Sequence, residues 1–139
     1  MATLKTTLTE TLTLNGKNYG NTISDDITGV NNVYQTVITV TSAATVALLQ
    51  FTAGNAQLGT IKDGDLKYFR VTNLDTTNYV DIALNNGGAS GFFQRVKAGE
   101  SFIITDDQVN TGAGFATLDY IKAQANTADV DMEIFIATA

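Results

Sequence analysis

The sequence contains no cysteine, histidine, tryptophan or proline among its 139 residues. Without cysteine the chain can form neither a disulfide nor a thiolate metal site. Without histidine it also lacks the base that most serine and cysteine nucleophiles require. These absences exclude Ser-His and Cys-His catalysis, while composition alone leaves catalysis by Asp and Glu open. We therefore expect a non-enzymatic protein that uses no cofactor.

Charge is scarce as well, and its balance is acidic. Charged residues make up 16% of the chain and hydrophobic residues 44%, which is apolar enough for a folded protein. The 14 acidic and 8 basic residues give a net charge of −6, which opposes both nucleic acid phosphates and anionic membrane surfaces. We therefore expect neither nucleic acid nor a membrane as a partner.

Long hydrophobic runs are missing too. No stretch approaches the 18 or so uninterrupted apolar residues of a membrane span, and the opening residues Met1 to Lys5 lack the apolar segment of a secretory signal. A length of 139 residues suits one domain. We therefore expect a single domain that spans residues 1–139. We also expect the protein to be made in the cytoplasm and not to be exported through a secretory signal.

Apolar and polar residues alternate with a period of two along much of the chain, which indicates β-strands. The final segment, Val130 to Ala137, shows the alternation most clearly. The segment from Val33 to Thr41 is largely apolar at both parities, which predicts a central strand buried on both faces. Leu118 to Gln124 fits either a short strand or one helical turn. Amphipathic helices of ten or more residues are not indicated.

Turn-forming residues separate these segments. Asn15-Gly16 is well suited to a two-residue hairpin turn, and the five residues Leu74 to Asn78 predict a hairpin between the strands that flank them. Gly- and Asn-containing stretches at 85–91 and 106–114 predict loops. The total of roughly 8–10 short strands predicts an all-β, antiparallel two-sheet β-sandwich of the jelly-roll or Greek-key type.

The first 14 residues are rich in threonine and leucine, with leucines at one parity and mainly threonines at the other. One interpretation is an edge strand whose solvent face is threonine. The other is an N-terminal arm that pairs with a neighbouring subunit, since a terminal strand exposes a free row of backbone donors and acceptors. Both interpretations remain open from the sequence.

Several apolar residues are candidates for a protein interface. The adjacent rings of Phe92 and Phe93 point to opposite faces of a strand, so one of the two is expected outside the core. The five tyrosines could form a sugar-binding platform or an interface patch, although packing with the hydroxyl at the rim is commoner. The candidate interface residues are Leu4, Leu8, Leu12, Tyr19, Phe92 and Phe93.

Acidic residues provide one candidate cation site. Asp129, Asp131 and Glu133 recur at every second position, so their carboxylates could converge on calcium. Calcium prefers six or more oxygen ligands, and the same spacing describes the solvated face of a strand with basic neighbours such as Arg70. We favour the solvated face and assign no metal site. Asp63-Gly64-Asp65 and Asp106-Asp107 are interpreted as turns.

Three parts of the chain resemble small virion structural proteins of tailed bacteriophages. They are Leu66 to Asp75 (LKYFRVTNLD), Val96 to Phe102 (VKAGESF), and the C-terminal segments Leu118 to Ala125 (LDYIKAQA) and Val130 to Ala137. The resemblance consists of strand and turn patterns, and it contains no functional residue to transfer.

The resemblance implies a β-sandwich that decorates or cements the capsid by binding the major capsid protein, often as a homotrimer, and that resides in the virion. Two alternatives remain. One is a tail, fibre or adaptor component, which would form rings or filaments. The other is a carbohydrate-binding β-sandwich module that would use exposed tyrosines and the loops at 85–91 and 110–114.

Overall fold

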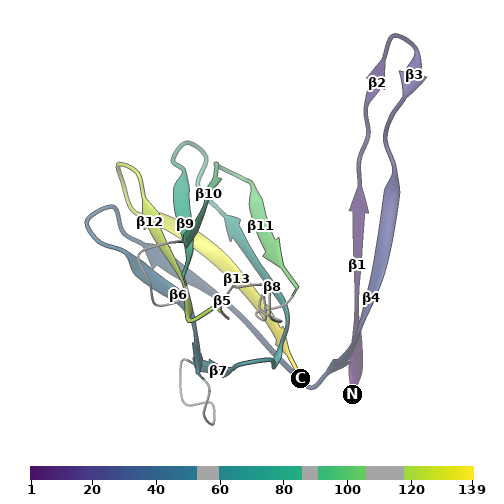
Figure 1. Ribbon diagram of the computed structural model, residues 1–139. Coiled ribbons are helices and arrows are strands. Elements are labelled where there is room, and N and C mark those ends of the chain that lie inside the picture. The colour runs from purple at the N-terminus through teal and green to yellow at the C-terminus, as the bar shows by residue number, and fades with distance from the viewer. Residues whose placement is uncertain (53–59, 86–90, 106–117) are drawn as a thin grey trace.

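The computed structural model describes residues 1–52, 60–85, 91–105 and 118–139 and shows two separate bodies of β-structure, a sandwich and a long hairpin (Figure 1). Most of the predicted loop at 85–91 and all of the predicted loop at 106–114 lie outside the described residues. The described residues contain no helix, and so none that could span a membrane. The chain is all-β, as the sequence predicts.

The hairpin is formed by the N-terminal part of the chain. Strands β1 (Ala2–Thr9) and β4 (Thr22–Val30) pair antiparallel, and the short β2 (Thr13–Leu14) and β3 (Lys17–Asn18) continue the ladder to the tip. At the tip, Asn15 and Gly16 both have positive φ, 52° and 77°, as the predicted two-residue hairpin turn requires. We call residues 2–30 the arm.

The sandwich is formed by two sheets with strand orders β11-β8-β13-β5 and β10-β9-β12-β6-β7. The bounds of its strands are β5 (Asn32–Val40), β6 (Val46–Thr52), β7 (Thr60–Lys62), β8 (Leu66–Asn73), β9 (Val80–Asn85), β10 (Gly91–Val96), β11 (Ser101–Ile104), β12 (Tyr120–Ala125) and β13 (Val130–Thr138). Apart from the short β7, which pairs parallel with β6, this order is that of a jelly roll, one of the two predicted topologies.

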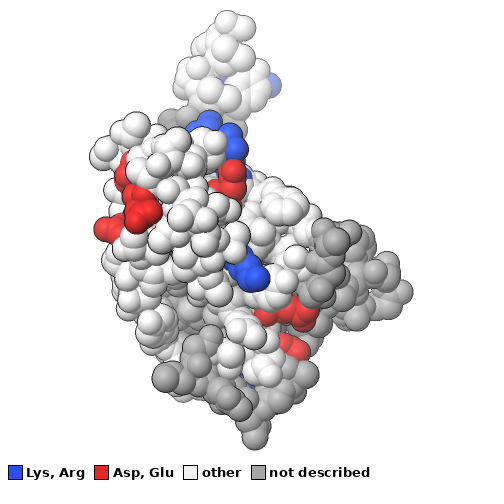
Figure 2. All heavy atoms as spheres, turned by 90° about the vertical axis from the view of Figure 1, so that its left-hand side faces the viewer, with Lys and Arg blue, Asp and Glu red and all other residues white. Residues whose placement is uncertain are grey.

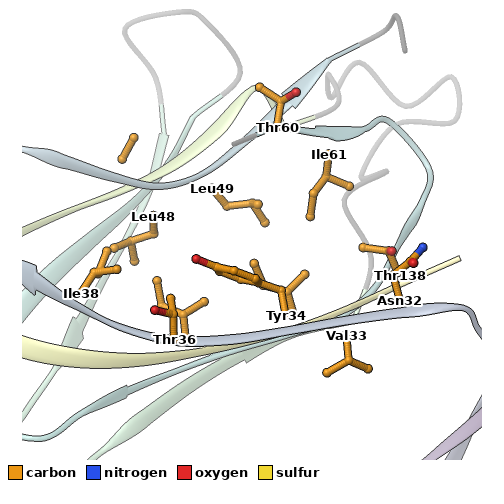
Figure 3. A pocket seen from close by; sticks show the side chains of 13 residues that line it. Asn32, Val33, Tyr34, Thr36, Ile38, Leu48, Leu49, Thr60, Ile61 and Thr138 are labelled. Atoms are coloured by element: carbon orange, nitrogen blue, oxygen red, sulfur yellow. The ribbon is translucent and has the colours of Figure 1, made fainter. Parts of the chain in front are cut away.

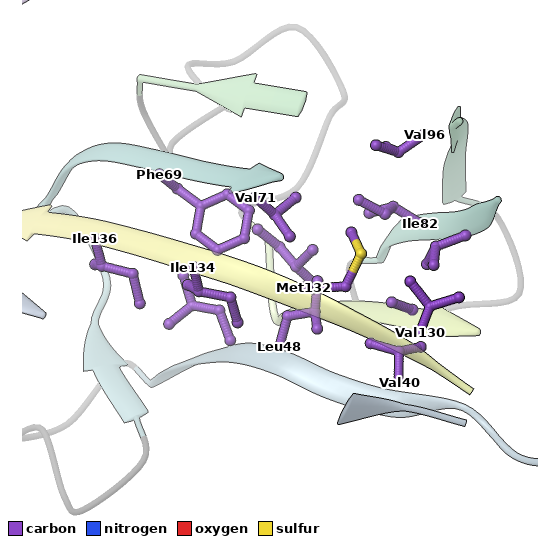
Figure 4. Packing of buried hydrophobic residues seen from close by; sticks show 14 of the residues in the cluster. Val40, Leu48, Phe69, Val71, Ile82, Val96, Val130, Met132, Ile134 and Ile136 are labelled. Atoms are coloured by element: carbon purple, nitrogen blue, oxygen red, sulfur yellow. The ribbon is translucent and has the colours of Figure 1, made fainter. Parts of the chain in front are cut away.

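The core lies between the two sheets (Figure 4). The strands β9, β12 and β13 contribute every second side chain to it. The predicted alternation of the last strand is confirmed in β13: Val130, Met132, Ile134 and Ile136 are buried, while Asp131 is exposed and Glu133 half-buried on the other face. The segment Leu118 to Gln124, which the sequence assigns to either a strand or a helical turn, contains most of the strand β12 (Tyr120–Ala125) and no helical turn. Burial of these alternating faces is the main stabilising contribution to the fold.

Two topological predictions are wrong. The segment from Val33 to Thr41 forms β5, which is an edge strand and not a central one. Its apolar residues at both parities do not reflect burial on both faces, because Val33, Tyr34 and Val37 are all more than half exposed. Likewise β8 and β9 do not form a hairpin, since their connection crosses from one sheet to the other.

That crossing is held by a buried asparagine. Asn73 is fully buried and donates from its side-chain amide to the carbonyls of Asn78 and Val96, at 2.9 and 3.2 Å. Its side-chain oxygen accepts from the backbone N–H of Asp75 at 2.8 Å. The side chain therefore satisfies backbone groups that the change of sheet removes from the ladder.

We expect Asn73→Ala to lower the free energy of unfolding by about 2 kcal/mol, because it leaves buried backbone groups without hydrogen-bond partners. Chemical denaturation monitored by circular dichroism measures this change. Thr77→Ala alters the same turn at an exposed side chain and should stay within about 0.5 kcal/mol of the wild type. Equal stability of Asn73→Ala and Thr77→Ala would contradict the structural role of Asn73.

The same turn makes stability depend on pH. The carboxylate of Asp75 accepts hydrogen bonds from the backbone N–H groups of Asn78 and Thr77, which lower the pKa of this side chain below its ordinary value. The contribution to stability is therefore present above the ordinary pKa and is lost as the pH falls through the lowered one.

We expect the melting temperature of the wild type to fall more steeply between about pH 5 and about pH 2 than that of Asp75→Asn. The amide oxygen of asparagine can accept the same hydrogen bonds without titrating. Thr76→Ser, which leaves the carboxylate in place, should follow the wild type. Parallel melting curves for wild type and Asp75→Asn across this range would rule out the proposed linkage.

Candidate interaction site

The arm joins the sandwich through a small hydrophobic cluster at its root. Val30, Tyr68 and Ala137 are buried there, and the partly buried Leu4, Ile27 and Phe135 pack against them. The rings of Tyr68 and Phe135 meet edge to face with centroids 5.9 Å apart, a favourable aromatic geometry. Burial raises the pKa of the Tyr68 hydroxyl. The cluster fixes the root of the arm on the outer face of the four-stranded sheet.

A bulge separates the root from the rest of the arm. Ala2 pairs with Val30 but Leu4 pairs with Ile27, so Thr28 and Gly29 together oppose the single residue Thr3. Gly29 has a φ of 77°, which a residue with a Cβ rarely adopts. Bulges bend a strand pair, and this one lies where the arm leaves the sandwich (Figure 1).

Beyond the root, the two faces of the arm differ. One face carries Leu4 and Leu8 opposite Ile27 and Ile23, with the pair Thr6 and Asp25 between them. The other face carries hydroxyl groups that interact across the strands, as Thr7 with Ser24 at 3.3 Å and Thr9 with Thr22 at 3.4 Å. The alternation of leucine and threonine predicted for residues 4–9 is therefore confirmed, and it places leucines on one face.

The outer half of the arm remains exposed. Leu8, Leu12 and Ile23 are more than half exposed, as are Leu14 and Tyr19 near the tip. The ammonium of Lys17 lies 5.2 Å from the centre of the Tyr19 ring. A groove of about 670 Å³ separates Leu8 and Ile23 from Arg70 and Ile103 on the outer face of the sandwich. Within the described part of the molecule, the apolar face of the arm therefore packs against the sandwich only at the root.

A second groove, of about 560 Å³, opens between the two sheets beside β5. Figure 3 shows Tyr34 reaching from β5 into this space below Leu49 and Ile61, while Val33 points to the opposite side. Ile134 and Ile136 of β13 also line it. Tyr34 lies on the inner face of the sheet, opposite Ile136, and yet it is 59% exposed. In the part of the chain that the structure describes, the sandwich is therefore incompletely closed along this side.

The six interface candidates from the sequence lie in two places. Leu4, Leu8, Leu12 and Tyr19 are on the arm, with Leu4 in the root cluster and the others exposed. Phe92 and Phe93 lie on β10, at the edge of the five-stranded sheet, which is the layer that does not carry the arm. Both rings are more than half exposed, so one ring lies outside the core as predicted, and the ring on the other face of the strand does not enter the core either.

Sequence reasoning missed the apolar residues of β5. Val33, Tyr34 and Val37 were attributed to a buried strand, because a doubly apolar pattern is the same for a central strand and for an edge that is left uncovered. Ile23 was missed as well, since β4 carries two adjacent aspartates that mask its alternation. Only the pairing of β4 with β1 places Ile23 beside Leu8.

The three acidic residues proposed to line one strand face have separate partners. Asp131 accepts from the Thr39 hydroxyl at 2.7 Å, and Asp129 accepts from the Ser42 backbone at 3.2 Å. Glu133 forms an ion pair with Arg70 at 2.6 Å, and this guanidinium lowers the pKa of the Glu133 carboxyl. Among the described residues, no three acidic side chains are grouped in a way that could hold a metal ion.

The tyrosines are also dispersed. Tyr19 lies near the arm tip, Tyr34 in the groove beside β5, and Tyr68 in the root cluster. Arg95 stacks over Tyr79 at 3.7 Å while it pairs with Asp81, and Lys122 lies 4.1 Å from the Tyr120 ring centre. The structure therefore does not bring the five rings together as one platform.

Charged side chains do not dominate the face of the sandwich that lies away from the arm. Figure 2 shows the side of the sandwich away from the arm as largely uncharged, with acidic and basic residues in small separate groups. A surface of this kind gives little long-range attraction to a strongly charged partner. The exposed features of the described chain that suit binding are therefore apolar side chains and free strand edges.

Comparison with known proteins does not identify a family for this chain. No protein-family model and no curated protein match the chain. A solved structure described as "Bacillus endospore appendages form a novel family of disulfide-linked pili" aligns over 80% of this chain and 93% of its own, at 16% identity and a TM-score of 0.32. That score is too low to establish a shared fold. The fold and site define this chain as a jelly-roll protein with a protruding hairpin arm.

The root cluster yields a test of how the arm is held. We expect Tyr68→Ala to raise the rates of amide hydrogen exchange in β1 and β4 at least tenfold, because it removes the central ring that Val30 and Phe135 contact. Exchange in β9 and β12 should change little. Val37→Ala, on the same sheet face but outside the cluster, is the matched control. Unchanged exchange in the arm of Tyr68→Ala would show that the cluster does not hold it.

Proposed function

We propose that this protein is a non-enzymatic structural subunit that joins a larger protein assembly through its arm. The observation that carries this proposal is the arm itself, a two-stranded hairpin whose outer half exposes Leu8, Leu12 and Ile23. Isolated two-stranded hairpins are marginally stable in water, and exposed apolar faces of this kind mark interaction sites. The arm therefore gains stability when another protein covers it.

The arm offers two kinds of contact at once. Its outer strand edges present backbone N–H and C=O groups that can extend the sheet of a partner, which is the mode of strand addition. Its leucine face can be buried in the same contact. Neither contact requires a charged or catalytic group, which agrees with the composition of the chain.

The particular assembly that we propose is the head of a tailed bacteriophage, where the protein would act as a capsid decoration or cement protein bound to the major capsid protein. The resemblance described above supports this choice. Phe92 and Phe93 provide a second exposed apolar pair on the opposite layer, suited to contact with the shell. Contacts formed only in the assembled shell add to the free energy needed to open it, and many copies multiply the effect.

The proposal is tested on virions produced with wild-type or altered protein. We expect the wild type to sediment with the particles in many copies, and the double variant Leu8→Ser/Ile23→Ser to fall at least tenfold in copy number, because the arm loses its apolar face. Thr7→Ala/Ser24→Ala changes the opposite face of the same strand pair and is the matched control. Copy number is measured by quantitative mass spectrometry of purified particles.

Two outcomes contradict the proposal. Wild-type protein that stays at the top of the gradient, apart from any particle, would remove the virion role. Full incorporation of Leu8→Ser/Ile23→Ser would show that the arm does not mediate assembly. Circular dichroism of both double variants establishes that the sandwich is folded, which the exposed positions of Leu8 and Ile23 lead us to expect.

A further inference from the structure

We propose that the arm of one copy adds to the outer edge of β5 in a second copy, where the described residues hold no further strand, and covers the apolar groove beside it. This inference rests on the proposed function, because it names the partner that the arm binds. The acceptor is defined by the edge of β5 and by Tyr34, Ile38, Leu49 and Ile61 around the groove.

The acceptor requires a strand rather than a compact ligand. In the described chain β5 pairs with β13 alone, so its other edge presents backbone groups to the outside. The groove follows the inner side of that edge, between β5 and the strands β6 and β7. A strand placed against β5 would satisfy the backbone groups and, at the same time, lay every second side chain over the groove.

The arm has the pattern that this position demands. β5 is 9 residues long, and the arm strands β1 and β4 are 8 and 9 residues long. Within β1, Leu4 and Leu8 alternate with Lys5, Thr7 and Thr9. An added arm can therefore direct Leu8 and Ile23 inward over Tyr34 and Leu49 while its hydroxylated face remains in water.

A chain cannot fill its own groove in this way. The root cluster holds its arm on the outer face of the four-stranded sheet, where Phe135 and Ala137 lie opposite Gln35 and Val33. The groove lies on the inner face, where Tyr34 is opposite Ile136. The arm would have to detach Val30, Leu4 and Ile27 from their buried contacts to reach it. The donor must therefore be another copy.

Donor and acceptor are different surfaces of the same chain, so the contact is heterologous. Contacts of this kind close into rings when the rotation between copies permits, and otherwise they propagate into filaments. A ring of three copies would agree with the trimer that the resemblance implies. In either case each chain both gives and receives one arm.

The lack of cysteine allows a direct test on the purified full-length chain. Thr7→Cys places a thiol on the hydroxylated face of the arm, and Val37→Cys places one on the exposed face of β5. When these two single variants are mixed and treated with a short bis-maleimide cross-linker, we expect a covalent dimer at several times the level that either variant forms alone. Gln94→Cys on β10 replaces Val37→Cys in the matched control mixture and should give only the background level.

A complementation experiment tests the same contact without a cross-linker. Leu8→Ser/Ile23→Ser disables the arm, and Tyr34→Glu places a charge in the acceptor groove at a half-exposed position. By light scattering, the wild type should show at least twice the chain mass of 14.8 kDa, and each variant alone should remain a monomer. A mixture of the two should form dimers and nothing larger, because one intact arm meets one intact groove.

The outcomes separate this inference from the proposed function. A wild type that stays monomeric at every concentration, or cross-linking equal to the Gln94→Cys control, would overturn the inference. Suppose that the inference is overturned in this way and that Leu8→Ser/Ile23→Ser still fails to enter virions. The arm would then bind a different virion protein, and the proposed function would stand. If the purified wild type associates as expected but never enters virions, the self-association stands and the virion role fails.

Discussion

The packing at the root of the arm is the contact on which the arrangement of this molecule depends. Val30, Tyr68 and Ala137 are buried together, with Leu4, Ile27 and Phe135 against them, on the outer face of the four-stranded sheet. Because this cluster directs the arm along the outer face, the apolar groove on the inner face is left for a different molecule. In the proposed assembly, a small set of side chains thereby separates the apolar surface that one chain buries by itself from the surface that a second copy covers.

The jelly roll supplies a rigid frame for both surfaces. Its core is closed by alternating side chains of two sheets, and the fully buried Asn73 holds a point where the chain changes sheet. The frame is incomplete at β5, whose edge carries no further strand in the described chain and whose Tyr34 faces inward but remains exposed. Natural sheets usually protect such an edge, so an unprotected one beside an apolar groove suits pairing with another chain.

Arm and groove together give the proposed structural role a physical basis. Main-chain hydrogen bonds along an added strand supply contact at every second residue, and the leucine side chains supply buried apolar area. The net charge of −6 and the scattered charged groups give no strong field that would direct binding to nucleic acid. Specificity in such a contact comes from the register of alternating side chains, since a slip of one residue would turn Leu8 and Ile23 toward water.

The sequence alone determined the class of the fold and much of its local structure. The period-two alternation of Val130 to Ala137, the Asn15-Gly16 turn and the leucine face of residues 4–8 all follow from local steric and solvation preferences, which each segment carries with it. The two-sheet sandwich also follows, because many short strands with apolar faces must bury those faces against one another. Leu8, Leu12 and Tyr19, three of the interface candidates from the sequence, are exposed on the arm.

Only the tertiary structure decided which strand lies at an edge and which face of it is covered. The apolar residues of β5 are equally suited to a central position, and Ile23 gains its partner Leu8 only through a pairing that spans the tip of the arm. The connection from Leu74 to Asn78 likewise has the length of a hairpin but changes sheet, because Asn73 and Asp75 hold its backbone. Strand order depends on contacts between residues far apart in the chain, and a local pattern contains no information about which of these contacts forms.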